Sequence, residues 1–193
     1  MKLETSKKYL KRLDKLGIKQ VGNGCFATVF QHPELKNVVV RYNEEPEPSY
    51  DRYVRKAMET QNPWLPRVFH VEHVELRHST ATFTFIEKLK HIKRKEEIAF
   101  TRSLLDCLPR MYFTDQGYGY NKDDFSFIDE IEDDMWMLIG KRHPDENFRA
   151  AFKIIRKLVM KGGGNFDFHS SNIMRRKDGQ LVFTDPIAYG FTM

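Results

Sequence analysis

The stretch that decides the fold is Asp167-Phe168-His169-Ser170-Ser171-Asn172-Ile173-Met174, followed after a short gap by Leu181-Val182-Phe183-Thr184-Asp185-Pro186. Between the two, Lys177-Asp178-Gly179 is a turn signal, and the apolar, β-prone run before Asp185 predicts a returning strand. Such a strand would bring Asp185 back beside Asn172. A lone Asp or Asn is usually a turn or capping residue. Three such side chains carried by one strand–turn–strand unit instead predict a site.

Asp167, Asn172 and Asp185 have the order and spacing of a phosphotransferase site. In phosphoryl transfer on the kinase fold, one Asp orients the acceptor hydroxyl, an Asn on the same loop holds one Mg²⁺, and a second Asp holds the metals that bridge the nucleotide phosphates. We assign these roles to Asp167, Asn172 and Asp185 in that order. Two hard oxygen ligands suit Mg²⁺, which keeps several waters and phosphate oxygens in its shell. ATP and Mg²⁺ are therefore the expected cofactors.

A glycine-rich segment near the other end of the chain is a second candidate for nucleotide binding. Gly22-Asn23-Gly24 and Val29 stand where the pattern G-x-G-x-x-G-x-V requires them, with Ala27 at the third glycine. The loop from Gly22 to Phe26 would cover the phosphates. The alternative is an ordinary hairpin turn, because glycine supplies the positive φ that such turns need.

Asn37-Val38-Val39-Val40-Arg41-Tyr42 predicts a further strand. Arg41 occupies the place of the lysine in the pattern V-A-I-K. Arginine keeps the positive charge and can grip phosphate, but its planar fork is not equivalent to a compact ammonium. We expect Arg41 to contact the nucleotide phosphates; the alternative is a solvated strand residue.

Helical spacing predicts a helix over residues 49–59, with a buried stripe formed by Tyr50, Tyr53, Val54, Ala57 and Met58. A carboxylate on this helix should pair with the basic residue of the preceding strand. Asp51 and Glu59 are the two candidates for reaching Arg41. The alternative is that both are surface partners of Arg55.

Residues 68–76 and 81–89 predict two strands joined by the polar turn Arg77-His78-Ser79-Thr80. In a kinase, this second strand runs into the hinge, whose backbone binds the adenine edge. Phe85 would then lie near the gatekeeper position, and Glu87 to Leu89 would form the hinge. The alternative is a half-buried strand without a nucleotide, since alternation of apolar and polar residues is common to all such strands.

Together these motifs resemble the protein-kinase-like fold, and within it the small serine/threonine protein kinases that short-tailed bacteriophages make early in infection. The likeness is carried by Gly22-Asn23-Gly24, by residues 64–69, and by residues 166–174 with Thr184-Asp185-Pro186. It covers roughly residues 15–190. The resemblance implies a two-lobed α+β fold with an antiparallel N-lobe sheet and a truncated helical C-lobe.

On this resemblance, residues 1–193 form one kinase-like domain, with an N-lobe at about 1–87, a hinge at about 87–90 and a C-lobe at about 91–193. It implies an ATP-dependent serine/threonine protein kinase that acts on host proteins in the bacterial cytoplasm. Two alternatives stay open. Arg41 in the lysine position also fits a pseudokinase that binds and inhibits a host protein. His169, two positions after Asp167, is the pattern of aminoglycoside-type small-molecule phosphotransferases.

Two further helices are expected, over residues 96–108 and 144–161. Gly162-Gly163-Gly164 would end the second. The acidic run at residues 129–134 is typical of a solvated helix start, although it could also select charged partners. Met193 is eight residues after Asp185, so no long activation segment is expected, and acceptor recognition would use segments such as residues 110–134.

The composition fits one globular unit, because 40% of the 193 residues are hydrophobic and no internal repeat occurs. No stretch approaches the roughly 20 apolar residues of a membrane span, and the start lacks a secretory signal, so we expect a cytoplasmic protein with no membrane partner.

Cys25 and Cys107 lack C-x-x-C spacing, which gives no indication of a zinc site. The net charge of +5 suits acidic ligands such as ATP. Nucleic acid stays an open but unsupported partner, because no recognition motif accompanies the basic runs.

Overall fold

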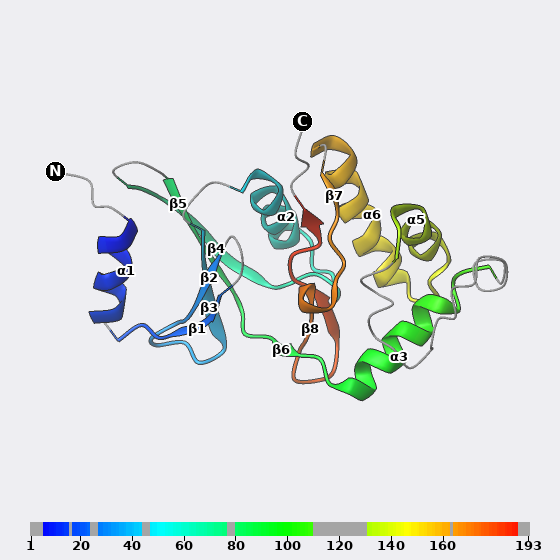
Figure 1. The fold of residues 1–193 in the computed structure, drawn as a ribbon, viewed down its shortest axis with the longest axis horizontal. Coiled ribbons are helices and arrows are strands. Elements are labelled where there is room, and N and C mark those ends of the chain that lie inside the picture. Colours follow the sequence, from blue (N-terminus) through cyan, green and yellow to red (C-terminus); the bar gives the residue numbers. More distant parts are fainter. Residues whose placement is uncertain are drawn as a thin grey trace. The chain divides into compact units, whose positions relative to one another are not determined.

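The computed structural model describes residues 6–15, 17–23, 27–43, 47–76, 80–109, 131–162 and 164–188. The chain forms two compact units: the first contains residues 1–61 and 66–88, and the second contains residues 62–65 and 89–193 (Figure 1). Residues 77–79 of the predicted turn 77–80 lie outside the described residues, as do Cys25 and residues 110–130, which include Asp129 and Glu130 of the acidic run; Thr80, the last residue of that turn, instead begins a strand. Within those that are described, no helix is both long and apolar enough to cross a membrane.

A five-stranded sheet forms the centre of the first unit (Figure 1). In spatial order its strands are β1 (Gln20–Asn23), β2 (Thr28–Gln31), β3 (Val38–Asn43), β5 (Thr80–Glu87) and β4 (Val68–Glu75). Every neighbouring pair is antiparallel. The central strand β3 is buried along its whole length, as its β-branched residues favour. The predicted α+β class with an antiparallel sheet is confirmed.

One face of this sheet carries an apolar core that the first helix covers. The core consists of Phe30, Val40, Tyr42, Leu76, Ala81 and Phe83. Helix α1 (Ser6–Lys15) packs Leu10 and Leu13 against it, while the described lysines and arginine of that helix are exposed. The basic residues of α1 therefore form a solvated face, and its leucines hold the helix in place.

Helix α2 (Pro48–Glu59) begins with Pro48, whose fixed φ suits the first helical turn. Its buried side contains Ser49, Tyr50, Tyr53, Val54 and Ala57. The prediction that Met58 belongs to this stripe is wrong, because Met58 is 51% exposed. With 3.6 residues per turn, Met58 falls at the edge of a stripe that is centred on Tyr50, Val54 and Ala57.

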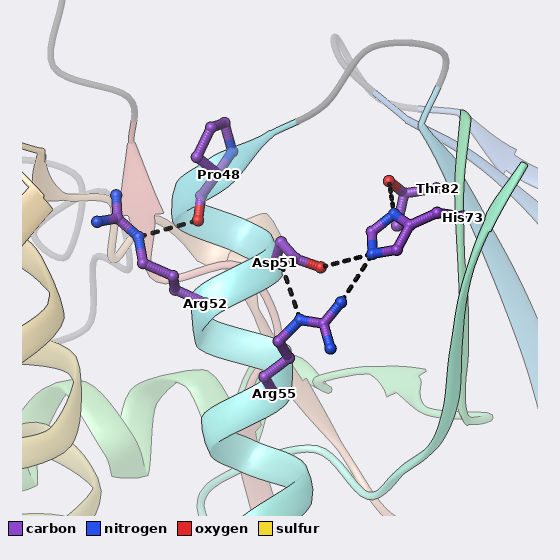
Figure 2. A network of polar contacts seen from close by, with 6 residues as sticks. All are labelled: Pro48, Asp51, Arg52, Arg55, His73 and Thr82. Carbon is purple, nitrogen blue, oxygen red and sulfur yellow. Dashed lines mark hydrogen bonds and ion pairs between the residues drawn. The ribbon is translucent and has the colours of Figure 1, made fainter. Parts of the chain in front are cut away.

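A polar network joins the opposite side of α2 to β4 and β5 (Figure 2). Arg55 Nε donates to Asp51 Oδ2 at 2.9 Å, and Arg55 Nη2 lies 2.7 Å from His73 Nε2. Arginine can only donate, so His73 Nε2 accepts and its Nδ1–H donates to Thr82 Oγ1, 3.1 Å away. Asp51 is thus a surface partner of Arg55, as one of the two alternatives predicted, whereas that alternative is wrong for Glu59, which pairs with Lys56.

The second unit combines helices with two small sheets (Figure 1). The helices are α3 (Arg94–Leu105), α5 (Asp133–Arg142) and α6 (Glu146–Gly162). One sheet has the order β6 (Lys90–His91), β8 (Ile173–Arg175) and β9 (Leu181–Phe183), and the other pairs β7 (Asn165–Phe166) with β10 (Ile187–Ala188). The predicted strand–turn–strand unit is β8 and β9, which pair in antiparallel register.

Helices α3 and α6 confirm the two predicted helices with small shifts of their ends. The predicted helix at residues 96–108 instead begins at Arg94, where the backbone N–H of the preceding Lys93 donates to Glu96 Oε2 at 2.7 Å. It ends at Leu105, and turns follow through Leu108. Helix α6 buries Phe148, Ala151, Phe152, Ile155 and Val159.

Candidate active site

The β8–β9 hairpin brings Asp185 back to the loop that carries Asp167 and Asn172. Ile173 pairs with Phe183, and the carbonyl oxygen of Asn172 accepts hydrogen bonds from Thr184 N at 2.8 Å and Thr184 Oγ1 at 3.0 Å. Asp185 is the next residue and is half-buried. On the other side, Asp167 N donates to Pro186 O at 2.9 Å. The two segments are therefore joined through their backbones at both Asn172 and Asp167.

The side chains of Asp167 and Asn172 contact each other directly. Asn172 Nδ2 donates to Asp167 Oδ2 at 3.0 Å and to Asp167 O at 2.9 Å. His169 Nε2 also lies 2.9 Å from Asn172 Nδ2, and His169 Nδ1 lies 2.7 Å from Ser171 Oγ. The amide nitrogen of Asn172 carries only two hydrogens for these three neighbours, so one N–H is shared between two of them. The amide oxygen of Asn172 is on the other side of the carboxamide and takes no part in these bonds.

Phe168 anchors this loop in the aromatic core of the second unit. It is 4% exposed and lies between polar neighbours that are both half-buried. Its ring centroid is 4.4 Å from that of Trp136 and 4.9 Å from that of Phe183. Burial of a large aromatic side chain fixes the backbone on both sides of it. The loop therefore presents Asp167 and His169 from a rigid base.

The tetrapeptide Asn62–Leu65 braces the hairpin from the second unit's interior. Phe183 N donates to Trp64 O at 2.9 Å. The buried guanidinium of Arg176 donates to Pro63 O and, at 2.9 Å, to Leu65 O. Sequence reasoning missed this role of Trp64 and Arg176, although Trp64 opens one of the stretches that carry the family resemblance.

Trp64 is held in turn by Asp145, which precedes α6. Trp64 Nε1 donates to Asp145 Oδ2 at 2.7 Å, and the N–H groups of Asn147 and Phe148 donate to Asp145 Oδ1. Burial alone would raise the pKa of Asp145, but these hydrogen bonds and the nearby His143 outweigh it and hold that pKa below its ordinary value. Asp145 is thus an ionised cap that fixes both Trp64 and the start of α6.

His143 lies beside this pair in the same aromatic cluster. Its ring stacks on Phe148 with centroids 3.9 Å apart, and its Nδ1 accepts from Asp145 N at 3.2 Å. Burial lowers the pKa of His143, because protonation would place a charge among the rings of Trp64 and Phe148. The neutral ring carries its proton on Nε2, which is buried and has no hydrogen-bond partner in the part of the chain that the structure describes.

In the first unit, β1 and β2 form the hairpin of the glycine-rich segment. Gly22 lies opposite Val29, and Asn23 Oδ1 accepts from Thr28 Oγ1 at 3.0 Å. Val29 is half-buried. Gly24 lies outside the described residues. A Cβ at Gly22 would make only ordinary contact with Val29, so packing within the described hairpin does not require glycine there.

Arg41 is buried on β3 and pairs with Glu47, just before α2. Arg41 Nη2 donates to Glu47 Oε2 at 3.1 Å. Neither carboxylate that the sequence offered fills this role: Asp51 pairs with Arg55, and Glu59 pairs with Lys56 at 2.8 Å. The prediction considered only carboxylates within the helix, whereas Glu47 is the residue that immediately precedes it. The alternative of a solvated Arg41 is also wrong, because the residue is 8% exposed.

Glu87 ends β5 as part of the sheet. Its Oε1 accepts from Arg67 N at 2.9 Å, and its own N–H donates to Arg67 O at 3.0 Å. Lys88 N donates to Asn37 O at 2.8 Å, and Leu89 is half-buried. The carboxylate of Glu87 therefore fixes the start of β4, and its predicted place in a nucleotide hinge stays a prediction.

The family described as bacteriophage T7 protein kinase 0.7 matches residues 4–192. The chain belongs to that family. Membership confirms the resemblance to phage protein kinases that the motifs indicated, and it supports the predicted class of ATP-dependent phosphotransferase. In this member of the T7 kinase family, the matched region includes Asp167, Asn172, Asp185 and Arg41.

Beyond the T7 kinase family, one matching solved structure is the crystal structure of a thermostable mutant of aminoglycoside phosphotransferase APH(4)-Ia in a ternary complex with ADP and hygromycin B. It has 19% sequence identity and a TM-score of 0.33, and the match covers 53% of this chain and 37% of that chain. No curated protein matches this chain.

Proposed function

We propose that this protein is a serine/threonine protein kinase that transfers the γ-phosphate of ATP to hydroxyl groups of host proteins. The observation that carries the proposal is the direct contact between Asp167 and Asn172 in a loop whose backbone is joined to Thr184 and Pro186, on either side of Asp185. Phosphoryl transfer depends almost wholly on positioning and electrostatic stabilisation. A loop that carries Asp167 and Asn172, joined by its backbone to the segment that carries Asp185, would supply both.

Asp167 would orient the acceptor hydroxyl and take up its proton as the bond to phosphorus forms. Its Oδ2 accepts from Asn172, which limits the carboxylate to few orientations. Asn172 and Asp185 would hold Mg²⁺, which brings charge neutralisation to the nucleotide phosphates when bound. The donor set fits this ion, because an amide oxygen and a carboxylate are hard ligands and Mg²⁺ is commonly bound by one or two protein groups together with phosphates and waters.

The first unit would supply the nucleotide contacts. Gly22, Asn23 and Gly24 would cover the phosphates, with Val29 behind them, and Arg41 would contact the phosphates with its charge. The backbone from Glu87 to Leu89 would bind the adenine edge. The family's description as a protein kinase favours a protein acceptor, and host proteins are the acceptors that a phage enzyme would meet.

The test is transfer of labelled γ-phosphate from Mg·ATP by purified protein into itself and into a bacterial lysate. Asp167→Asn and Asp185→Ala should each lower the rate by at least about a hundredfold, because each removes a positioned charge from the reaction centre. Asp178→Ala is the matched control, since Asp178 is an exposed Asp in the turn of the same hairpin. Circular dichroism checks that all variants are folded.

Labelled proteins with the wild type and with Asp178→Ala alone would support the proposal. Label confined to small molecules would favour the aminoglycoside-type alternative that His169 suggests. Full transfer by Asp185→Ala would refute the assigned site. No transfer by folded wild type would favour a pseudokinase that binds a host protein.

A further inference from the structure

The side chain of Arg41 is enclosed on a flat face and at one edge. Its Cζ lies 3.3 Å from the centroid of the Tyr50 ring, in the first turn of α2. At its edge, Nη2 donates to Glu47 Oε2. Asn43 Nδ2 donates to the same oxygen at 2.8 Å. Tyr50 and Asn43 are 3% and 1% exposed, so the enclosure is part of the protein interior.

The shape of this enclosure suits a guanidinium group and not an ammonium group. A guanidinium is flat, so it can stack on an aromatic ring while an N–H at its edge bonds a carboxylate. The lysine side chain ends at the position that Cζ occupies in arginine, one bond short of Nη2. A lysine ammonium here would lie over Tyr50 but would lose the short contact with Glu47, and it has no flat face to stack.

We propose that Tyr50, Glu47 and Asn43 form a receptor for a guanidinium group, and that Tyr50 is a positioning residue which sets the plane of Arg41. Arginine is then required at this position of β3, and lysine cannot replace it. The proposal rests on the proposed function only where it links Arg41 to the nucleotide; the receptor itself is a property of the first unit. Through the receptor, the first turn of α2 controls how the cation of β3 is presented to phosphate.

The first test compares Arg41→Lys with chemical rescue of Arg41→Ala. Binding of Mg·ATP is measured by titration calorimetry. Arg41→Lys should weaken binding by about tenfold or more, because the ammonium loses the hydrogen bond to the Glu47 carboxylate that orients the cation. Arg41→Ala should regain binding when methylguanidinium is added and should not respond to methylammonium at the same concentration. Arg52→Lys, an exposed position on the same helix, is the matched control and should bind as the wild type does.

A second pair of variants tests Tyr50 itself. Tyr50→Phe keeps the ring face and should bind Mg·ATP as the wild type does, whereas Tyr50→Leu should show the loss seen with Arg41→Lys. Combining Tyr50→Leu with Arg41→Ala should abolish rescue by methylguanidinium. A residue with a merely structural role would not discriminate between the two added cations.

Thermal unfolding followed by circular dichroism separates failure of this proposal from failure of the proposed function. If the wild type binds no ATP, the kinase assignment fails, yet methylguanidinium should still raise the unfolding midpoint of Arg41→Ala and leave that of the wild type unchanged. If Arg41→Ala does not fold, the contrasts of Arg41→Lys with Arg52→Lys and of Tyr50→Leu with Tyr50→Phe decide. The proposed receptor would be refuted if wild type, Arg41→Lys and Tyr50→Leu had equal affinity for ATP and equal midpoints of thermal unfolding.

Discussion

Trp64 holds two parts of the second unit, one through its backbone and one through its side chain. Its backbone oxygen accepts from Phe183 in the hairpin that carries Asp185, and its indole N–H donates to Asp145 at the start of α6. Its ring packs against Phe100, Phe148 and Phe183 with centroids 5.7, 5.0 and 5.5 Å away. The position of the β8–β9 hairpin therefore depends on Trp64, which precedes Phe183 by 119 positions in the chain (183 − 64).

Trp64→Phe keeps an aromatic ring but removes the donor to the Asp145 carboxylate. We expect it to lower the free energy of unfolding by about 2–3 kcal/mol, the scale for a hydrogen bond to a charged group. Urea denaturation of Trp64→Phe, Asp145→Asn and the double variant measures this as a double-mutant cycle. The two substitutions should be non-additive by about 1 kcal/mol or more. Additive effects would show that the indole–carboxylate bond contributes nothing of its own.

At the scale of elements, α5 and α6 approach closely at Gly140, and Figure 1 shows these helices beside each other. A Cβ at Gly140 would overlap the ring of Phe152. That ring lies among Phe148, Phe166 and Phe168, so it has little room to move. Glycine at this helix position is thus a consequence of packing, because its low helix propensity would otherwise disfavour it.

Gly140→Ala should therefore destabilise the protein by about 1–3 kcal/mol, the usual cost of overpacking, although alanine is the better helix former. Lys141→Ala, an exposed neighbour on the same helix, serves as the control and should change stability by less than about 0.5 kcal/mol. Urea denaturation measures both. Adding Phe152→Leu to Gly140→Ala should restore part of the loss, and a stabilising effect of Gly140→Ala alone would contradict the close approach.

At the scale of the whole molecule, both tryptophans belong to the second unit, since Trp64 lies in residues 62–65 and Trp136 in residues 89–193. Both are buried. Tryptophan fluorescence therefore reports unfolding of the unit that contains Asp167, Asn172 and Asp185. Circular dichroism reports both units, so a difference between the two signals would measure how independently the units unfold.

The same probe tests how stability depends on pH. The folded protein holds the pKa of His143 below its ordinary 6.5, so the unfolded chain binds the proton first as the pH falls. Stability from this group is complete above about pH 6.5 and is lost below it, by at most about 1.4 kcal/mol per pH unit. Asp145 also loses its contribution to stability as the pH falls below 3.8, the ordinary pKa of this group, because the folded protein holds its pKa lower. His143→Asn keeps an acceptor for the N–H of Asp145. Its free energy of unfolding, measured by urea denaturation followed by fluorescence, should change less between about pH 6.5 and 5 than that of the wild type. Parallel curves for wild type and variant would contradict the assignment.

Much of the molecule could be predicted because the signals are local. The β8–β9 hairpin follows from a turn signal between two apolar runs, and α2 and α6 follow from helical spacing of their buried residues. The glycine-rich hairpin and the order of Asp167, Asn172 and Asp185 indicated the kinase family, which the family match confirmed. The periodic spacing of apolar residues indicates which side of a helix or strand faces the core, so these elements can be predicted from a single sequence.

The partners of buried charged groups were decided by tertiary structure alone. Glu47, which immediately precedes α2, pairs with Arg41 in place of Asp51 or Glu59. Asn62–Leu65 belongs to the second unit, where Trp64 is buried in the aromatic core and Arg176 donates to Pro63 O and Leu65 O. Such contacts depend on which surfaces, distant in the sequence, pack together and on the space between them. No periodic pattern in the sequence predicts either property.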